Sequence, residues 1–127
     1  MDVTPLIPAD RQVIDSYSPH GFRVSGVAHA GAIIVFPDRT MAWDVVAMAG
    51  VTAESLAAVI FRGQQREVEI LLLGCGAQMR AIQNEVRKTL RGAGIVTDAM
   101  DTRAACRTYN ILLAEERRVA AALLPIS

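Results

Sequence analysis

The chain has 127 residues, 52% of them hydrophobic and 20% charged, and its 13 basic and 13 acidic side chains cancel to zero net charge. This composition is typical of a folded globular protein, excludes a disordered chain, and gives no general affinity for nucleic acid or an anionic membrane. The two cysteines, Cys75 and Cys106, have neither metal-binding nor redox-motif spacing and form no disulfide framework, which favours a reducing, cytoplasmic location.

Residues 1–10 are expected to form an irregular N-terminal arm, because Pro5 and Pro8 obstruct strand pairing. The arm lacks the pattern of a signal peptide, and no apolar run in the chain is long enough to span a bilayer. We therefore expect a soluble chain with one globular domain over residues 11–127.

The N-terminal half of this domain alternates short apolar segments with turn-forming residues. Phe22 and Val24 alternate with polar side chains, as in a strand with one buried face, whereas Ala32–Phe36 is apolar throughout and predicts a strand covered on both faces. The expected strands are 13–17, 22–25, 32–36 and 41–44, separated by turns at 18–21, 26–31 and 37–39. Such short connections favour antiparallel pairing.

From Thr52 onward, helices alternate with strands. The expected order is a helix over 52–61, a strand over 69–73, a helix over 78–91, a strand over 95–97, a helix from 101 or 102 to 115 and a strand over 118–124. A strand–helix–strand unit with short loops has parallel strands and a right-handed crossover. The predicted fold class is therefore α/β (mixed α+β), with antiparallel N-terminal strands followed by βαβ units that share one mixed sheet.

The turn after the first parallel strand is the first candidate site, because ligands bind beyond the carboxyl ends of parallel strands. Gly74, Cys75 and Gly76 are expected to lead directly into the helix over 78–91, whose first N–H groups could bind an anion and whose dipole would favour a thiolate at Cys75. A third glycine is missing, so a dinucleotide site is disfavoured. The only candidate bases are His20 and His29, and a structural cysteine is the favoured interpretation.

The second candidate is the polar segment that opens the last helix. Asp101 or Thr102 caps this helix, Tyr109 is expected to face the sheet with its hydroxyl bonded, and Thr108 or Asn110 is expected to bond neighbouring backbone. Arg103 and Arg107 form a cationic stripe that suits a carboxylate or, more simply, solvent. Trp43 is expected to be a core or interface anchor. The scattered cysteines and histidines predict no metal site.

The segment Met100–Asn110 resembles the C-terminal signature of a family of small, largely uncharacterised proteins. This family includes the third mitochondrial respiratory complex I assembly factor and an adipogenesis-associated protein. The resemblance implies a three-layer β/β/α fold and a non-enzymatic role in assembling a membrane complex. Cys75, His20 and Glu116 stand where threonine, glycine and glycine are usual in the family. Other segments that carry the resemblance are Gly21-Phe22, the strand before Pro37, Trp43, Leu71–Gly76, Gly94-Ile95 and Arg117–Leu123.

The sequence thus predicts a non-enzymatic interaction or assembly-helper protein with protein partners, membrane-complex subunits among the candidates, and with no cofactor, no nucleic acid and no insertion into a membrane. The alternative is a small-molecule-binding protein or small enzyme that uses the pocket around Gly74–Gly76, with Cys75 or Asp101 as the reactive group. We expect Arg107 and the amides of the turn to receive an anionic or carbonyl group. The residues predicted to form the pocket or interaction surface are Trp43, Gly74, Cys75, Gly76, Asp101, Thr102, Arg107, Thr108, Tyr109 and Asn110.

Overall fold

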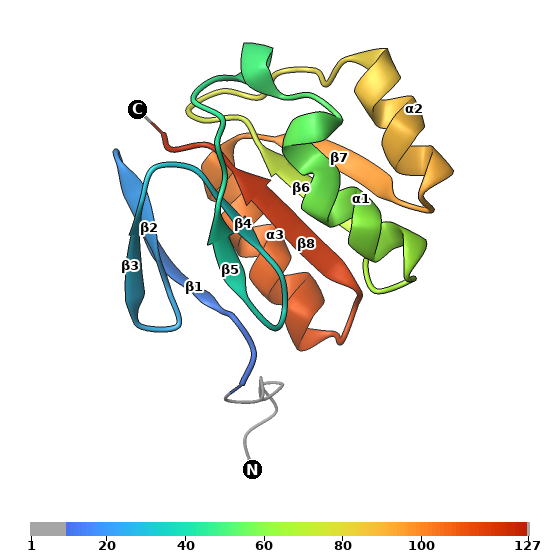
Figure 1. Ribbon diagram of the computed structural model, residues 1–127. Helices are drawn as coiled ribbons and strands as arrows, with labels where there is room; N and C mark the ends of the chain where they lie inside the picture. The colour runs from blue at the N-terminus through green and yellow to red at the C-terminus, as the bar shows by residue number, and fades with distance from the viewer. Residues whose placement is uncertain (1–9, 127) are drawn as a thin grey trace.

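A computed structural model describes residues 10–126 of the chain (Figure 1). The N-terminal arm expected over residues 1–10 lies outside the described residues except for Asp10. The strands are β1 (Ile14–Ser18), β2 (Gly21–Val24), β3 (Val27–Ala30), β4 (Ile33–Val35), β5 (Thr40–Ala42), β6 (Ile70–Gly74), β7 (Val96–Met100) and β8 (Val119–Leu123). The helices are α1 (Ala57–Gln64), α2 (Asn84–Gly92) and α3 (Thr102–Ala114), with 3-10 turns η1 (Met48–Gly50) and η2 (Glu54–Leu56).

The centre of the fold is a five-stranded mixed sheet with the order β5-β4-β8-β6-β7. Strand β6 pairs in parallel with β7 and β8, while β4 pairs antiparallel with β5 and β8. All residues of β4 and β8 are buried, and so are Leu71, Leu72 and Leu73 of β6. The apolar runs in the sequence therefore lie on strands covered on both faces, and the predicted mixed sheet is confirmed.

A second, three-stranded antiparallel sheet with the order β1-β2-β3 packs beside the first. Its third strand corrects the sequence prediction, because Val27–Ala30 was expected to be part of a turn. The turn is in fact only Ser25 and Gly26, both at positive φ, and Val24 pairs with Val27 directly across it. Two of the four residues of β3 are alanine, a weak strand former, so its sequence did not predict a strand, and the strand depends on pairing with β2.

The helices cover the two faces of the five-stranded sheet and also bring one correction. The helix expected over 52–61 is a 3-10 turn from Glu54 followed by α1, which ends at Gln64; the Thr52 hydroxyl, just before the turn, accepts the Ser55 N–H at 3.1 Å. Helix α2 begins at Asn84, not at Gln78, and residues 77–83 form an irregular connection. Ile82 reaches the core from this connection without a helix. Its spacing of four residues from Val86 therefore did not indicate that the helix begins before Ile82. Helix α3 matches its predicted range closely.

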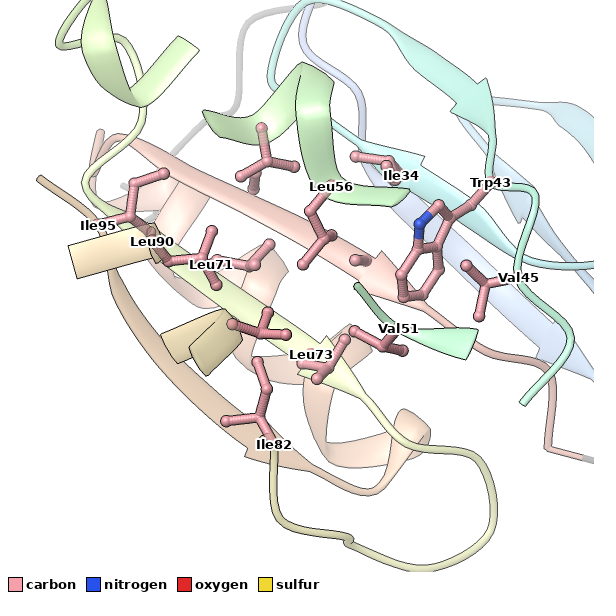
Figure 2. Close-up of a cluster of buried hydrophobic side chains, with 14 of the residues drawn as sticks. Ile34, Trp43, Val45, Val51, Leu56, Leu71, Leu73, Ile82, Leu90 and Ile95 are labelled. Carbon is pink, nitrogen blue, oxygen red and sulfur yellow. The ribbon is translucent and has the colours of Figure 1, made fainter. Parts of the chain in front are cut away.

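Two apolar cores lie on opposite faces of the five-stranded sheet. The first packs α1 and α2 against Leu71 and Leu73 and includes Trp43 (Figure 2). The second packs α3 and the small sheet against the other face and contains Leu72, Tyr109 and Phe22. Figure 1 shows the resulting layers, with α1 and α2 in front of the sheet and α3 behind it. The mixed-sheet, layered fold expected from the sequence is thus confirmed.

Candidate functional site

Asp101 and Thr102 lie at the start of α3, where Thr102 connects the helix to two strand ends. The Asp101 carboxylate caps the helix by accepting the Ala104 N–H at 3.0 Å. The Thr102 hydroxyl, fully buried, accepts the Gly76 N–H at 2.8 Å and donates to the Leu124 carbonyl at 2.7 Å. The Thr102 N–H donates in turn to the Gly76 carbonyl at 2.9 Å. Thr102 therefore holds the turn after β6 against the end of β8, while Asp101 fixes the start of α3.

The turn itself is closely packed. A Cβ atom on Gly74 would lie 2.9 Å from Leu123 Cδ2 and 3.0 Å from Thr102 Oγ1, so the junction leaves no room for a side chain there. The N–H of Cys75 donates to the Met100 carbonyl at 2.9 Å, and the N–H of Gly76 is held by Thr102. The turn amides that were expected to receive an anionic group are thus already bonded within the protein.

Cys75 is not at a helix N-terminus, because α2 begins nine residues later in the sequence, at Asn84. The helix-dipole argument for a reactive thiol therefore has no basis in this fold. The side chain is 7% exposed, and its thiol lies 3.4 Å from the Arg80 carbonyl, to which it donates. Neither His20 nor His29 lines the hollow that Cys75 borders, so the candidate Cys–His pair is not assembled there.

Tyr109 and Asn110 attach the small sheet to α3. The Tyr109 hydroxyl donates to the Gln12 carbonyl at 2.9 Å from a fully buried ring, as the sequence predicted. The Asn110 side chain accepts the Ile14 N–H at 3.0 Å and donates to the Ile14 carbonyl at 2.8 Å. Asn110 thereby completes the hydrogen bonding of β1 as a neighbouring strand would. Burial also raises the pKa of the Tyr109 hydroxyl above its usual range.

Arg107 and Thr108 lie on the outer side of α3. Arg107 is exposed, and so is Arg103, whose guanidinium lies 6.0 Å from the centre of the Tyr17 ring. Arg107 does not line the hollow beside the Gly74–Gly76 turn, so the structure does not bring this arginine and the turn together. The two arginines form the exposed cationic stripe that their spacing predicted.

Trp43 belongs to the first core and not to an open surface. The side chain is 5% exposed, and its indole Nε1–H donates to the Ser55 carbonyl at 2.8 Å. Figure 2 shows the indole pointing toward Leu56 and Val51 within the buried cluster. Trp43 is therefore the core anchor that the sequence allowed, and its bond to Ser55 fixes the start of the helical layer.

A surface hollow of about 430 Å³ lies beside the Gly74–Gly76 turn; we call it the turn groove. Three segments that are distant in the sequence line it: Val46–Met48, Cys75–Arg80 except Met79, and Leu124–Ile126. A second hollow of about 420 Å³ shares Met48 and Arg80 with it and continues toward Ile82. Val46, 96% exposed, lies on the wall of the turn groove, and Met79, 61% exposed, lies within its Cys75–Arg80 segment.

Sequence analysis identified Cys75 and Gly76 in this groove but missed Val46, Met48 and Arg80. The sequence gave one weak indication that Val46 belongs to a surface site: it is a large apolar residue in a segment without helix or strand periodicity. Among residues 10–126, no group of three His, Cys, Asp or Glu side chains is arranged to hold a metal ion. Within the same range, no helix is both long enough and apolar enough to cross a membrane.

A family described as "Protein of unknown function (DUF498/DUF598)" matches residues 14–124. NADH dehydrogenase (ubiquinone) 1 alpha subcomplex assembly factor 3 of Danio rerio is 38% identical over 113 residues. That alignment covers 89% of this chain and 64% of the assembly factor, so the chain spans less than two thirds of the relative's length.

Two solved structures share the fold. A Bartonella henselae protein described as an outer membrane protein is 35% identical, with a TM-score of 0.85 over 96% of this chain and 100% of that one. A Bordetella pertussis protein described as an Mth938-like domain is 30% identical, with a TM-score of 0.84 over 100% of this chain and 94% of that one. The fold is therefore Mth938-like, and the family resemblance read from the sequence is confirmed.

Proposed function

Because the chain belongs to the family described as a protein of unknown function (DUF498/DUF598), we propose that it is a non-enzymatic helper that binds protein partners during the biogenesis of a respiratory or other membrane complex. The similarity to a relative whose name is that of a complex I assembly factor supports this class of partner. The family match extends over residues 14–124, so it includes every segment that lines the turn groove up to Leu124.

The exposed apolar surface at the turn groove is the observation that carries the proposal. Val46, 96% exposed, lines a hollow that also contains Met48 and Ile126, and Met79, 61% exposed, lies in the chain between two of the lining residues. Large apolar side chains gathered at a surface hollow are typical of protein interaction sites. Methionine adapts its shape to different partner surfaces, which suits a protein that holds a client temporarily.

A small-molecule or enzymatic role remains the second candidate, because Cys75 borders the same groove. A thiol nucleophile needs a base within hydrogen-bond reach. The Cys75 thiol instead donates to the Arg80 carbonyl, and the other proposed reactive group, Asp101, caps α3 outside the groove lining. The geometry of the groove therefore favours binding of a partner over catalysis.

Site-specific photo-crosslinking in the native cell tests this proposal. A photo-reactive amino acid at Met79 is expected to crosslink subunits or assembly intermediates of a membrane complex. The matched control is Phe61, which is also 61% exposed but lies on α1, away from the groove lining. Equal crosslinking from both positions, or none from Met79 in cells that are assembling their membrane complexes, would contradict the proposal.

A genetic experiment separates the two candidate functions. Val46→Asp combined with Met79→Asp is expected to reduce the amount of assembled complex on native gels when it replaces the wild-type chain. Cys75→Ser is expected to leave assembly intact if the protein is a helper, and to abolish its effect if the thiol is catalytic. Thermal unfolding of each purified variant distinguishes lost binding from lost folding. Normal assembly with the double variant would exclude the turn groove as the partner site.

A further inference from the structure

Strand β3 forms an open edge of the small sheet. Val24 pairs with Val27 across a turn of two residues, and in such hairpins the residues that flank the turn exchange hydrogen bonds. Bonded and non-bonded pairs then alternate, so Val27 and His29 bond to β2. The Gly31 N–H donates to the His20 carbonyl at 2.9 Å, which continues this alternation. The N–H and C=O groups of Ala28 and Ala30 therefore point away from β2.

Side chains bond backbone groups on two other edge strands of the fold, β1 and β7. The Asn110 amide bonds both backbone groups of Ile14 on β1. The Arg87 guanidinium donates to the Thr97 carbonyl on β7 at 2.8 Å. Within residues 10–126, no side chain bonds the outward groups of Ala28 or Ala30, and β3 contains no proline, lysine or bulge of the kind that usually blocks an exposed edge. Figure 1 shows β3 at the margin of the molecule.

We propose that β3 is a self-association edge at which a second copy of this chain adds its own β3 in antiparallel orientation. In the register centred on His29, Ala28 faces Ala30 of the second copy and Ala30 faces its Ala28. Each of these pairs exchanges two hydrogen bonds, so all four outward groups on each copy find a partner. A two-fold axis perpendicular to the sheet relates the copies and keeps their inner faces on the same side.

The backbone pattern selects this register, in which the edge of β3 is complementary to itself. A register centred on Ala28 would pair Ala28 with itself and place Ala30 opposite Gly26, at the end of the hairpin, where no strand continues. The side chains of Ala28 and Ala30 project from a face of the sheet and are small, so a second strand can approach the edge without steric obstruction. His29 then lies directly opposite its counterpart as a non-hydrogen-bonded pair, in which Cα atoms are about 4.5 Å apart.

Disulfide trapping tests the register. His29→Cys places two thiols opposite each other at a separation that a disulfide can bridge. Val27→Cys is the matched control, because in the same register its two copies are about 13 Å apart along the strands. Val27 is 57% exposed and both native cysteines are buried, so accessibility does not favour the test variant. We expect at least a tenfold excess of covalent dimer for His29→Cys, and equal yields would overturn the register.

Sedimentation equilibrium of the purified full chain tests the association itself. A contact of four hydrogen bonds predicts a dissociation constant of about 10 μM to 1 mM. Ala30→Pro removes one outward N–H and is expected to weaken association at least tenfold, whereas Ala30→Val keeps the N–H and is expected to retain it. Circular dichroism verifies that both variants fold. A wild-type chain that stays monomeric at about 1 mM, or a dimer that Ala30→Pro leaves unchanged, would overturn the proposal.

Discussion

Thr102 shows how a polar residue that resembles a functional group can instead hold the fold together. Its hydroxyl is fully buried and bonds both the Gly76 N–H and the Leu124 carbonyl. A buried polar group needs a hydrogen-bond partner in place of the water that it loses on folding. If one partner is removed, the remaining buried donor or acceptor is left unpaired, and this destabilises the fold. Residues at this junction thus determine the shape of the turn that borders the turn groove.

Thr102→Val is therefore expected to lower the free energy of unfolding by about 2–4 kcal/mol, because it leaves a buried N–H and a buried carbonyl unpaired. Urea unfolding of the purified variant measures the change. Thr108→Val provides the control, since Thr108 is only half-buried on the same helix, and its effect is expected to be within about 0.5 kcal/mol. Equal stability of the two variants would contradict the structural role of Thr102.

Thr97 presents the opposite case. Its hydroxyl oxygen is buried beneath α2 and, within residues 10–126, has no hydrogen-bond partner. Thr97→Val replaces this hydroxyl by a methyl group of similar size in a strand and is expected to raise the free energy of unfolding by about 1 kcal/mol. Thr97→Ser, which keeps the hydroxyl and loses the methyl group, is expected to be destabilising. A loss of stability in the valine variant would indicate a bound partner for the hydroxyl.

At the scale of secondary structure, α3 supports the small sheet through a single amide side chain. Asn110→Ala leaves both backbone groups of Ile14 without their partner and is expected to cost about 1–3 kcal/mol. Because the loss is local, amide hydrogen exchange at Ile14 should accelerate by at least tenfold relative to Leu72 in the five-stranded sheet. The control is Asn84→Ala at the exposed start of α2. Unchanged protection of Ile14 would show that β1 does not depend on Asn110.

The end of α3 contains a residue in an unfavourable backbone conformation. Glu116 has a φ of 61°, in the left-handed region where a Cβ atom is costly. Glu116→Gly is expected to raise the midpoint of thermal unfolding, by a free energy of about 1 kcal/mol. Glu115→Gly is the control, because Glu115 has a φ of −85° and its replacement should be destabilising. Loss of stability in both variants would refute the strain argument.

The elements that the sequence predicted well are those whose signal is local. Helix α3 has an N-cap and a continuous apolar side, and β6 is an unbroken apolar run, so neither depends on distant parts of the chain. The start of α2 and the strand β3 depend on tertiary contacts. Ile82 packs into the core from an irregular connection, and β3 is held by its pairing with β2. Such contacts override residue spacing and propensity.

At the scale of the whole molecule, the candidate site could be predicted only in part. The sequence placed Cys75 and Gly76 at the carboxyl end of a buried strand, where the turn groove indeed lies. The opposite wall, with Val46 and Ile126, comes from segments whose positions depend on the order of strands in the mixed sheet. Periodicity in a single sequence does not define the order of the strands. The groove and its exposed rim could therefore be identified only from the structure.

The division of the molecule into two cores leads to a pH prediction, because Cys106 lies in the core between α3 and the sheets. Burial raises the pKa of the Cys106 thiol to about 12, an effect that the nearby Arg107 charge only partly opposes. The thiol of an unfolded chain ionises near pH 9, roughly three units lower. Between these values the folded state binds more protons than the unfolded state, so stability must fall as pH rises.

We therefore expect the wild-type chain to lose roughly 1.4 kcal/mol of stability per pH unit from this thiol as the pH rises from about 9 toward 12. Cys106→Val fills a similar volume without an ionisable group, so its stability should decline less steeply by that amount. Urea unfolding of both proteins at several alkaline pH values measures the difference between the slopes, which removes contributions from Tyr109 and other groups common to both. Parallel slopes would mean that water reaches Cys106 in the folded protein, and that the second core is less tightly closed than its buried side chains indicate.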